Sequence, residues 1–547
     1  MPPQRVRKFI VVLGGVMSGL GKGGVTSSLA RTFAARQYSV TALKIDPYIN
    51  IDAGLFSPYE HGEVFVLDDG SEVDQDLGNY ERFLDITLTR DHNITTGKVY
   101  REVIAKERRG DYLGKTVQII PHITDMIKER ISKTAERDDA DITLIEVGGT
   151  VGDIESMPFL EAVRQLQREK GRENVAFVLL ALAPELSVVG EQKTKPVQHS
   201  VHTLMGAGIQ PDAIICRSRR PLDSSVKKKV ALFCNVPEDA VISDPDVGTI
   251  YELPFVFEEE GLPNSLCNRL GAFSPNPLYG PWKKYVKTIK APGKLTVKVA
   301  VTGKYTSLRD SYLSIHESMI HAAAHLGVDL DLAWMETTDM ADSVALEGTD
   351  GIIVPGGFGS RGTEGKIAAI GHARENGIPF LGLCFGFQLA VAEYARAVCG
   401  LERANSTEND AETPHPVIDL LPDQREIQDM GGTMRLGTYP ATLAPGTQVR
   451  ALYGGAEIVD ERHRHRYEVN HAYVEQLEKA GLVFSGRSPD GNLMEFLELP
   501  GHPFFVATQA HPEFKSRLER PAPLFLGFLK AAAERARTRL KGKKATE

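Results

Sequence analysis

The chain has 547 residues, of which 42% are hydrophobic and 25% are charged, and its formal net charge is −9. This length exceeds what one hydrophobic core supports and predicts two domains. The acidic balance excludes broad binding to nucleic acids or membrane surfaces, and no apolar run approaches the ~18 residues that span a bilayer.

The first residues pass from a few basic side chains directly into an apolar strand, without the small-residue cleavage site of an export signal. The five cysteines form no CxxC pair and are odd in number. These features argue against a disulfide framework and a zinc site, and they predict a cytoplasmic protein.

The N-terminal half alternates short apolar runs with amphipathic stretches, which is typical of a parallel sheet flanked by helices. We expect strands at residues 9–13, 40–45, 142–147 and 176–182, with helices between them. Ligands in such sheets gather at the carboxyl ends of the strands, so the residues that follow each strand are the candidates for binding.

A glycine loop, GGVMSGLGKGG, follows the first strand and opens a helix. Its backbone N–H groups can hold phosphates while Lys22 neutralises them, although a structural glycine turn is the alternative. The loop departs from the usual phosphate-loop pattern, because Gly23 stands where a serine or threonine would bind magnesium.

The missing hydroxyl requires other oxygen ligands for magnesium. Glu146 ends a predicted strand and precedes the glycine-rich turn GGTVGD, and Asp76 in DQDLGNYER is the second candidate. A helix cap or a solvated surface acid is the alternative for either residue, and for Asp76 taken alone that alternative is favoured.

Residues 271–295 are rich in proline and glycine and predict a linker between two domains. We expect a domain over residues 1–270, a second over residues 296–540, and a disordered tail over residues 541–547. The second half again alternates strands and helices. Strands are expected at residues 297–301, 330–334, 351–354 and 379–383, followed by a strand-rich region.

The segment PFLGLCFGFQ carries Cys384 between a strand and a helix, with glycines two residues to either side. This is the pattern of a strained turn that presents a nucleophile, although an ordinary buried cysteine is the alternative. His511 and Glu513 follow a later strand and can serve as base and orienting carboxylate. The segment VPGGFG offers the backbone N–H groups of Gly356 and Gly357 to an oxyanion.

Many long segments resemble one family in the same order, including KFIVVLGGVMSGLGKG, KIDPYINIDAG, HGEVFVLDDGSEVDQDLGNYERF, KERRGDYLGKTVQIIPHIT, EVGGTVGDIES, GEQKTKPVQHSV, VPGGFGSRG, ANSTE, GGTMRLG, ERHRHRYEVN and QAHPEF. The family is CTP synthase, whose C-terminal half is a class I glutamine amidotransferase. The resemblance implies two doubly wound α/β domains with mainly parallel sheets, a P-loop-like synthase and a glutaminase.

The family's reaction implies that ATP phosphorylates the 4-oxygen of UTP and that ammonia from glutamine displaces the phosphate. The resemblance assigns ATP to Gly19, Leu20, Gly21, Lys22, Gly23, Gly24, Lys44, Asp76, Asp246 and Val247. It assigns UTP, or CTP as inhibitor, to Ser18, Asp153, Ile154, Glu155, Lys193, Thr194, Lys195, Pro196, Val197, Gln198 and Lys229.

Magnesium is assigned to Asp76 and Glu146, and the glutaminase triad to Cys384, His511 and Glu513. Glutamine is assigned to Gly357, Phe385, Gly386, Phe387, Gln388, Glu408 and Arg466. Pro58 and His61 match a region near the family's ammonia passage. The resemblance also implies activation by GTP and a homotetramer, and it is compatible with filaments.

The chain departs from the family pattern at Gly19, where a serine is usual, in CFGFQ, and in END after ANSTE. Two other kinds of protein remain as alternatives. One is another amide ligase with the same two halves, against which the basic residues Lys193, Lys195 and Lys229 argue. The other is a non-catalytic nucleotide switch or filament protein, which would not need a nucleophilic cysteine.

Overall fold

The computed structural model describes residues 6–546 except 187–189, 305, 307, 339–345, 422–423 and 425–430; the side chains of residues 309 and 542–546 also lie outside this description. The chain divides into two compact units. The first comprises Met1–Asp52 and Asp76–Gly280, and the second Ala53–Gln75 and Pro281–Glu547. The second unit therefore includes a segment from the N-terminal part of the sequence, which no pattern in the sequence indicated.

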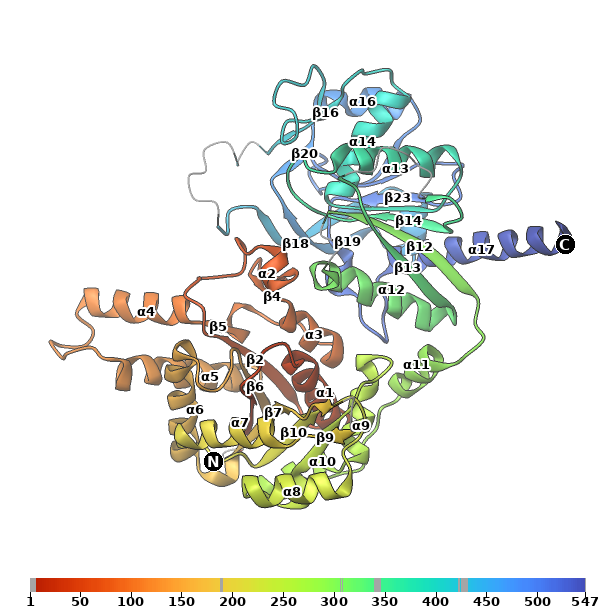
Figure 1. Ribbon diagram of the computed structural model, residues 1–547. Coiled ribbons are helices and arrows are strands. Elements are labelled where there is room, and N and C mark those ends of the chain that lie inside the picture. Colours follow the sequence, from red (N-terminus) through yellow and green to blue (C-terminus); the bar gives the residue numbers. More distant parts are fainter. Residues whose placement is uncertain are drawn as a thin grey trace. The chain divides into compact units, whose positions relative to one another are not determined.

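A seven-stranded sheet forms the centre of the first unit (Figure 1), in the order β11-β10-β7-β1-β6-β2-β5. All of these pairings are parallel. The strands are β1 (Lys8–Gly14), β2 (Val40–Asp46), β5 (Asn93–Thr95), β6 (Ile142–Val147), β7 (Val175–Leu182), β10 (Ala213–Arg217) and β11 (Val241–Asp244). The predicted α/β fold is confirmed. Because β1 and β6 are neighbouring parallel strands, the loops that follow them begin at the same edge of the sheet.

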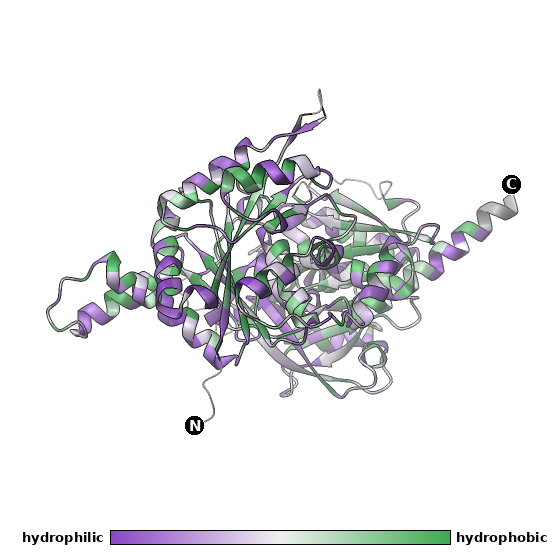
Figure 2. Ribbon diagram, turned by 90° about the horizontal axis from the view of Figure 1, so that it is seen from below, coloured by the Kyte–Doolittle hydropathy of each residue, from purple (hydrophilic) through white to green (hydrophobic). Residues whose placement is uncertain are grey.

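Helices pack along this sheet, with α1 (Lys22–Ala35) against α9 (Leu253–Glu259) and α5 (Thr124–Arg137) against α6 (Met157–Lys170). The others are α3 (Gln75–Leu84), α4 (Thr96–Arg109), α7 (Lys195–Gly206), α8 (Ser224–Cys234) and α10 (Leu262–Arg269). A short hairpin of β8 (Glu185–Leu186) and β9 (Glu191–Gln192) precedes α7. In Figure 2 the strands are largely hydrophobic, whereas the helices alternate hydrophobic and hydrophilic residues.

The second unit contains a nine-stranded sheet in the order β13-β12-β14-β15-β23-β22-β21-β18-β19. It is parallel from β13 to β23 and antiparallel from β23 to β19. The strands are β12 (Thr296–Gly303), β13 (Asp329–Glu336), β14 (Gly351–Val354), β15 (Phe380–Leu383), β18 (Arg435–Leu443), β19 (Ile458–His465), β21 (Val483–Arg487), β22 (Met494–Glu498) and β23 (Phe505–Thr508).

The helices of this unit are α2 (Pro58–His61), α11 (Pro281–Lys290), α12 (Leu313–Leu326), α13 (Thr363–Glu375), α14 (Phe385–Ala397), α15 (Gln448–Leu452), α16 (His471–Lys479) and α17 (Pro523–Thr546). A small sheet joins β16 (Asn405–Ser406), β17 (Pro416–Leu420) and β20 (Tyr467–Val469). Helix α11 lies within the segment that was predicted as a linker.

The central strands of this sheet are buried on both faces. Ile352 and Val354 of β14 belong to one hydrophobic cluster, whereas Ile353 between them belongs to a second cluster. Successive side chains of a strand point to opposite faces, so a continuously apolar strand is the expected sequence for a sheet covered on both sides. This arrangement holds the end of β15, and with it Cys384, on a rigid support.

Residues 53–75 dock onto the second unit as a hairpin of β3 (Val64–Val66) and β4 (Glu72–Asp74), preceded by α2. The buried guanidinium of Arg462 pairs with Asp68 and also donates to the Val66 carbonyl at 3.0 Å. Glu63 accepts from the backbone N–H of Ser314 at 3.0 Å. Polar anchors at both ends of β3 therefore fix the segment in place.

The C-terminal end differs from the expected disordered tail. Helix α17 continues through residues 541–546 to Thr546. Three of the six residues are lysine and one is alanine, and both residue types favour helix, which is consistent with the continuation. Among the helices in the described part of the chain, none combines the length and the apolar character needed to cross a membrane.

The docking of residues 53–75 gives a test of Arg462. We expect Arg462→Met to lower the melting temperature of the protein, because a buried charge-assisted hydrogen bond to Asp68 is lost, with an effect of about 1.5–3 kcal/mol. Limited proteolysis should then cut within residues 53–75. An unchanged melting temperature together with unchanged resistance to protease would contradict this role.

Candidate active sites

The glycine loop lies between β1 and α1 in the first unit. Gly19 and Gly21 have φ values of 72° and 88°, a left-handed conformation that glycine adopts without strain. This explains glycine in place of serine at position 19. The side chain of Lys22 lies under the loop, where its Nζ donates to the Gly149 carbonyl at 2.6 Å. Burial lowers the pKa of Lys22, and the charge of Glu146 opposes this shift.

A cluster of charged side chains lies next to this loop. Lys44 Nζ pairs with Asp76 and with Glu146, in the second case at 2.6 Å. The Tyr80 hydroxyl donates to the other oxygen of Glu146. Burial raises the pKa of Glu146 and the charge of Asp76 raises it further, whereas Lys44 acts in the opposite direction. Asp76 and Glu146, the two predicted magnesium ligands, are thus both paired with the ammonium group of Lys44.

The position of Asp76 explains why Gly23 replaces the usual hydroxyl residue. A Cβ atom at Gly23 would lie 1.8 Å from Asp76 Oδ1, so any side chain there would exclude the carboxylate. Magnesium is commonly held by one or two carboxylates together with substrate phosphates. Two carboxylates that already hold a cationic group beside a phosphate loop fit this ion, although no cluster of three His, Cys, Asp or Glu side chains suited to a metal occurs among the described residues.

The segments assigned to UTP surround the same loop. The backbone N–H of Val16 donates to Ser200 Oγ of α7 at 3.1 Å, and that of Val151 donates to the Gly14 carbonyl at 3.0 Å. Asp153 accepts from the Thr150 N–H at 2.7 Å. The loop that carries Asp153, Ile154 and Glu155 and the helix that begins at Lys195 therefore both adjoin the phosphate loop.

The remaining residues assigned to nucleotides lie around this edge of the sheet. Ser18 and Ile154 are exposed, whereas Val197 and Gln198 are buried in α7. Lys193 pairs with Glu191 at 2.6 Å, and the charge of Lys229 also acts on Glu191. Asp246 follows β11 at the outer end of the sheet and pairs with Arg217 at 2.7 Å, with Val247 beside it.

In the second unit, Cys384 occupies the turn between β15 and α14. Its φ of 49° and ψ of −98° are strained for a residue other than glycine. Both flanking glycines are required, because a Cβ atom at Gly386 would lie 2.1 Å from the Val354 carbonyl and one at Gly382 would lie 2.9 Å from the Gly386 carbonyl. The predicted nucleophile turn is present.

His511 and Glu513 lie beside this cysteine. His511 Nδ1 hydrogen-bonds Glu513 Oε1 at 2.7 Å, and within the described part of the chain the buried His511 Nε2 has no hydrogen-bond partner. Burial would lower the pKa of His511, but the charges of Glu513 and Cys384 raise it to about 10. These neighbours therefore favour the protonated form of the imidazole.

Gly356 leaves the space between these groups open. A Cβ atom at this position would lie 3.0 Å from His511 Cε1 and 3.7 Å from Cys384 Cβ. The thiol itself has two polar neighbours, because Cys384 Sγ donates to the Arg464 carbonyl and accepts from Gln509 Nε2, both at 3.6 Å. Gln509 was not predicted, although it lies only two residues before His511.

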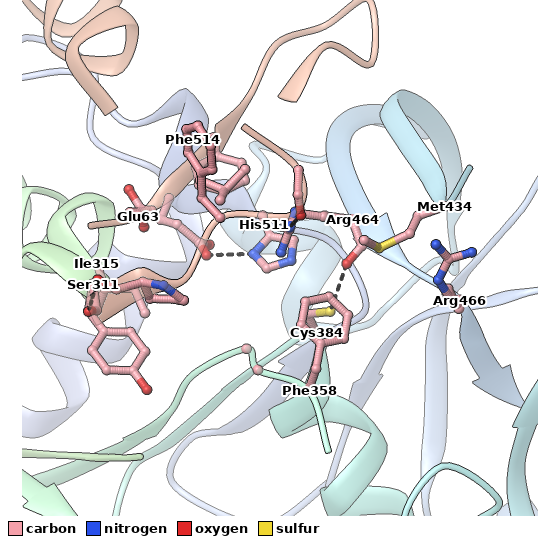
Figure 3. A pocket seen from close by; sticks show the side chains of 18 of the residues that line it. Glu63, Ser311, Ile315, Phe358, Cys384, Met434, Arg464, Arg466, His511 and Phe514 are labelled. Atoms are coloured by element: carbon pink, nitrogen blue, oxygen red, sulfur yellow. Dashed lines mark hydrogen bonds and ion pairs between the residues drawn. The ribbon is translucent and has the colours of Figure 1, made fainter. Parts of the chain in front are cut away.

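These groups open into a cavity of about 460 Å³ within the second unit (Figure 3). Figure 3 shows Cys384 between the backbone of Arg464 and the ring of Phe358, with His511 above and Arg466 and Met434 to one side. Residues 53–75 supply part of the wall, including Pro58 from the region predicted near an ammonia passage. His61 does not line the cavity but stacks on Phe56, which does, with ring centroids 4.2 Å apart.

The residues assigned to glutamine divide into two groups. Gly357, Glu408 and Arg466 line the cavity, whereas Phe385, Gly386, Phe387 and Gln388 lie beneath it. Glu408 accepts from the Gly359 N–H at 2.7 Å, and Gln388 donates to the Tyr467 carbonyl at 3.0 Å. Sequence reasoning missed Phe358, Met434, Arg464 and Tyr467, whose surrounding motifs it had quoted without assigning a role to these positions.

Comparison with known proteins identifies the family. The model for the CTP synthase N-terminus matches residues 8–272, and the model for class-I glutamine amidotransferase matches residues 307–531. The CTP synthase of Thermococcus kodakarensis is 60% identical over 531 residues, which cover 96% of this chain and 99% of that relative.

The chain belongs to the CTP synthase family. A second family member, from Methanopyrus kandleri, is 58% identical over 96% of this chain and 99% of that protein. A solved structure of the Trypanosoma brucei CTPS glutaminase domain with bound acivicin is 40% identical, covering 44% of this chain and 94% of that chain at a TM-score of 0.41. Members of the CTP synthase family are glutamine-hydrolysing ligases that form a C–N bond, and this chain is such a ligase.

The contact between Gly23 and Asp76 gives a test in this CTP synthase family member. We expect Gly23→Ser to lower CTP formation from either glutamine or ammonia by roughly 10²-fold, because the new side chain displaces the Asp76 carboxylate from the phosphate loop. CTP formation is measured by ultraviolet absorbance.

The matched control is Gly206→Ala in α7, where an added methyl group meets nothing within 4 Å. This variant should retain wild-type activity. Near-normal CTP formation by Gly23→Ser would contradict the need for close approach of Asp76.

Proposed function

We propose that the chain uses ATP to phosphorylate the 4-oxygen of UTP, and that ammonia cut from glutamine displaces the phosphate to give CTP. The observation that carries this proposal is one chain with two different reactive centres. A phosphate loop with a carboxylate pair lies in one unit, and a thiol, imidazole and carboxylate lie in the other.

In the glutaminase centre, Cys384 attacks the side-chain amide carbon of glutamine as a thiolate. Glu513 accepts a hydrogen bond from Nδ1–H of His511, which leaves the Nε2 side of the ring directed at the reacting groups. The raised pKa of His511 keeps a proton available for the leaving ammonia. Water then releases glutamate from the thioester, with His511 now acting as base.

The oxyanion of this reaction needs preorganised N–H donors. We assign them to Gly357, from the segment predicted for this role, and to Phe385, whose N–H opens α14 and has no partner within the helix. The loop after β14 that carries Gly357 is fixed on both sides of this residue. Lys304 donates to the Phe358 carbonyl, and Glu408 accepts from the Gly359 N–H.

In the synthase centre, Lys22 and the backbone of residues 19–24 hold the phosphates of ATP, and Lys44 orients the two carboxylates. Asp76 and Glu146 would hold the magnesium ion, which when bound neutralises the phosphate oxygens and polarises the transferred group. Lys44 must shift or share its carboxylates when ATP and the metal enter, because its ammonium lies between them.

The uracil nucleotide is assigned to the loop at Asp153 and the start of α7, which adjoin the phosphate loop, and to Lys229, whose charge acts on Glu191. The same residues would bind CTP as an inhibitor. We extend the family's properties to activation by GTP, a homotetramer and a cytoplasmic location. Each of these follows from the family and carries no separate geometric argument.

One variant should separate the glutaminase activity from the synthase activity. Cys384→Ala removes the nucleophile for glutamine, so glutamine-dependent CTP formation should fall to background. With ammonium salts at mildly alkaline pH, where more ammonia is unprotonated, the same variant should form CTP at close to the wild-type rate.

Lys22→Ala should lose both reactions, because ATP phosphates are needed with either nitrogen source. Continued glutamine consumption by the Cys384 variant, or loss of its ammonia reaction while it remains folded, would overturn the division into two centres.

The assignment of UTP to Lys193 gives a second test. Lys193→Ala should raise the apparent KM for UTP, since the loss of one charge-assisted contact has an effect of about 1.5–3 kcal/mol. The KM for ATP should change little. Glu191→Ala, which removes the carboxylate paired with Lys193, should leave the KM for UTP unchanged or lower it. A change in the KM for ATP alone would mean that Lys193 serves the other nucleotide.

A further inference from the structure

A lysine that the proposed mechanism does not use is buried behind the glutaminase cavity. Lys366 lies on α13 and is 1% exposed, and its Nζ has no hydrogen-bond partner among the described residues. A buried ammonium without a partner is unfavourable by several kcal/mol in comparison with a neutral side chain. Its retention at this position calls for a function that offsets the lost stability.

The neighbours of Lys366 indicate that function. Its Nζ lies 5.1 Å from the centroid of the Phe385 ring and 3.6 Å from the position that a Cβ atom of Gly357 would occupy. These are the two residues whose N–H groups we assign to the oxyanion. The amine therefore lies against the backbone of Gly357 and over the side-chain ring of Phe385.

The charged groups that act on Lys366 are Lys304 after β12, Glu336 at the end of β13, and Cys384 before α14. Burial lowers the pKa of Lys366, and Lys304 lowers it further, against Glu336 and Cys384, to about 7. Lys304 differs from Lys366 in that its Nζ already donates to the Phe358 carbonyl. Lys366, by contrast, makes no hydrogen bond to the described backbone of the loop that carries Gly357.

The geometry points to Lys366 as a positioning residue of the glutaminase centre: its buried ammonium supplies the positive charge that stabilises the oxyanion held by Gly357 and Phe385. This inference rests on the proposed glutaminase mechanism. It requires no direct contact with glutamine. The amine acts through the field at the two donors, which is strong because burial lowers the local dielectric constant.

The test is Lys366→Met in the full-length enzyme, which keeps the length of the side chain and removes the charge. The kcat for glutamine hydrolysis should fall roughly tenfold or more, less than the ~10²–10³-fold loss for a direct oxyanion donor. The KM for glutamine should stay within about twofold, because the interaction is made in the transition state. CTP formation from ammonia should not change.

The pH profile provides a readout that a merely structural role would not give. The charged amine is the active form, so the kcat of the wild-type enzyme should fall as pH rises through the pKa of Lys366 in the glutamine complex. Lys366→Met should lack this decline, since no proton remains to be lost. The exposed Lys298 of β12 gives the matched control, and Lys298→Met should show the wild-type profile.

The pH dependence of the melting temperature gives a third readout, for which the direction of the change can be predicted. The folded pKa of Lys366 lies at about 7 and its ordinary value is 10.5, so the unfolded chain binds more protons between these values. The destabilisation by Lys366 is therefore complete below pH 7 and disappears toward pH 10.5. Lys366→Met should raise the melting temperature more at pH 6 than at pH 10.

Three outcomes would overturn the inference: an unchanged kcat in Lys366→Met, an equal loss in the ammonia reaction, or a change in KM alone. Failure of the proposed function is distinguishable from all three, because it would appear as glutamine hydrolysis that survives Cys384→Ala.

Discussion

Arg464 joins the parts of the glutaminase centre that come from distant stretches of the chain. Its carbonyl accepts from the thiol of Cys384, and its guanidinium pairs with Glu72 at 2.8 Å and donates to the Gly54 carbonyl at 3.0 Å. The same guanidinium lies 5.1 Å from the centroid of the Phe358 ring. The backbone and the side chain of this one residue thus contact the nucleophile, the loop of Phe358 and residues 53–75, and the cavity wall depends on that alignment.

The sequence predicted those features that follow from local pattern. Apolar runs in the sequence predicted the observed bounds of β6 and β14. Both strands are buried along their whole length, so the ends of each apolar run coincide with the ends of the strand. The glycines around Cys384 predicted the strained turn, because only glycine tolerates the approach of the Val354 carbonyl at position 386. Both inferences needed only a few consecutive residues.

Features that depend on contacts between distant parts of the sequence could not be predicted from it. For Asp76 taken alone, a helix cap or a surface acid was the favoured interpretation, because nothing in its own segment reveals its contact with Gly23 at the phosphate loop. Residues 53–75 read as part of the N-terminal domain, because secondary-structure pattern does not tell which core a hairpin joins. No sequence motif singled out Lys366, because its burial results from packing against segments distant in the sequence.

The docked hairpin also has a consequence for how the chain is made. Asp68 and its partner Arg462 are 394 residues apart, so the ribosome completes the hairpin long before it makes the surface that receives it. At ~5–20 residues per second this interval is roughly 20–80 seconds. During that time Val64, Phe65 and Val66, which are buried in the finished protein, have no site to pack into. The nascent chain must therefore carry an exposed apolar strand through most of synthesis, which makes it a natural client for chaperones that shield such segments.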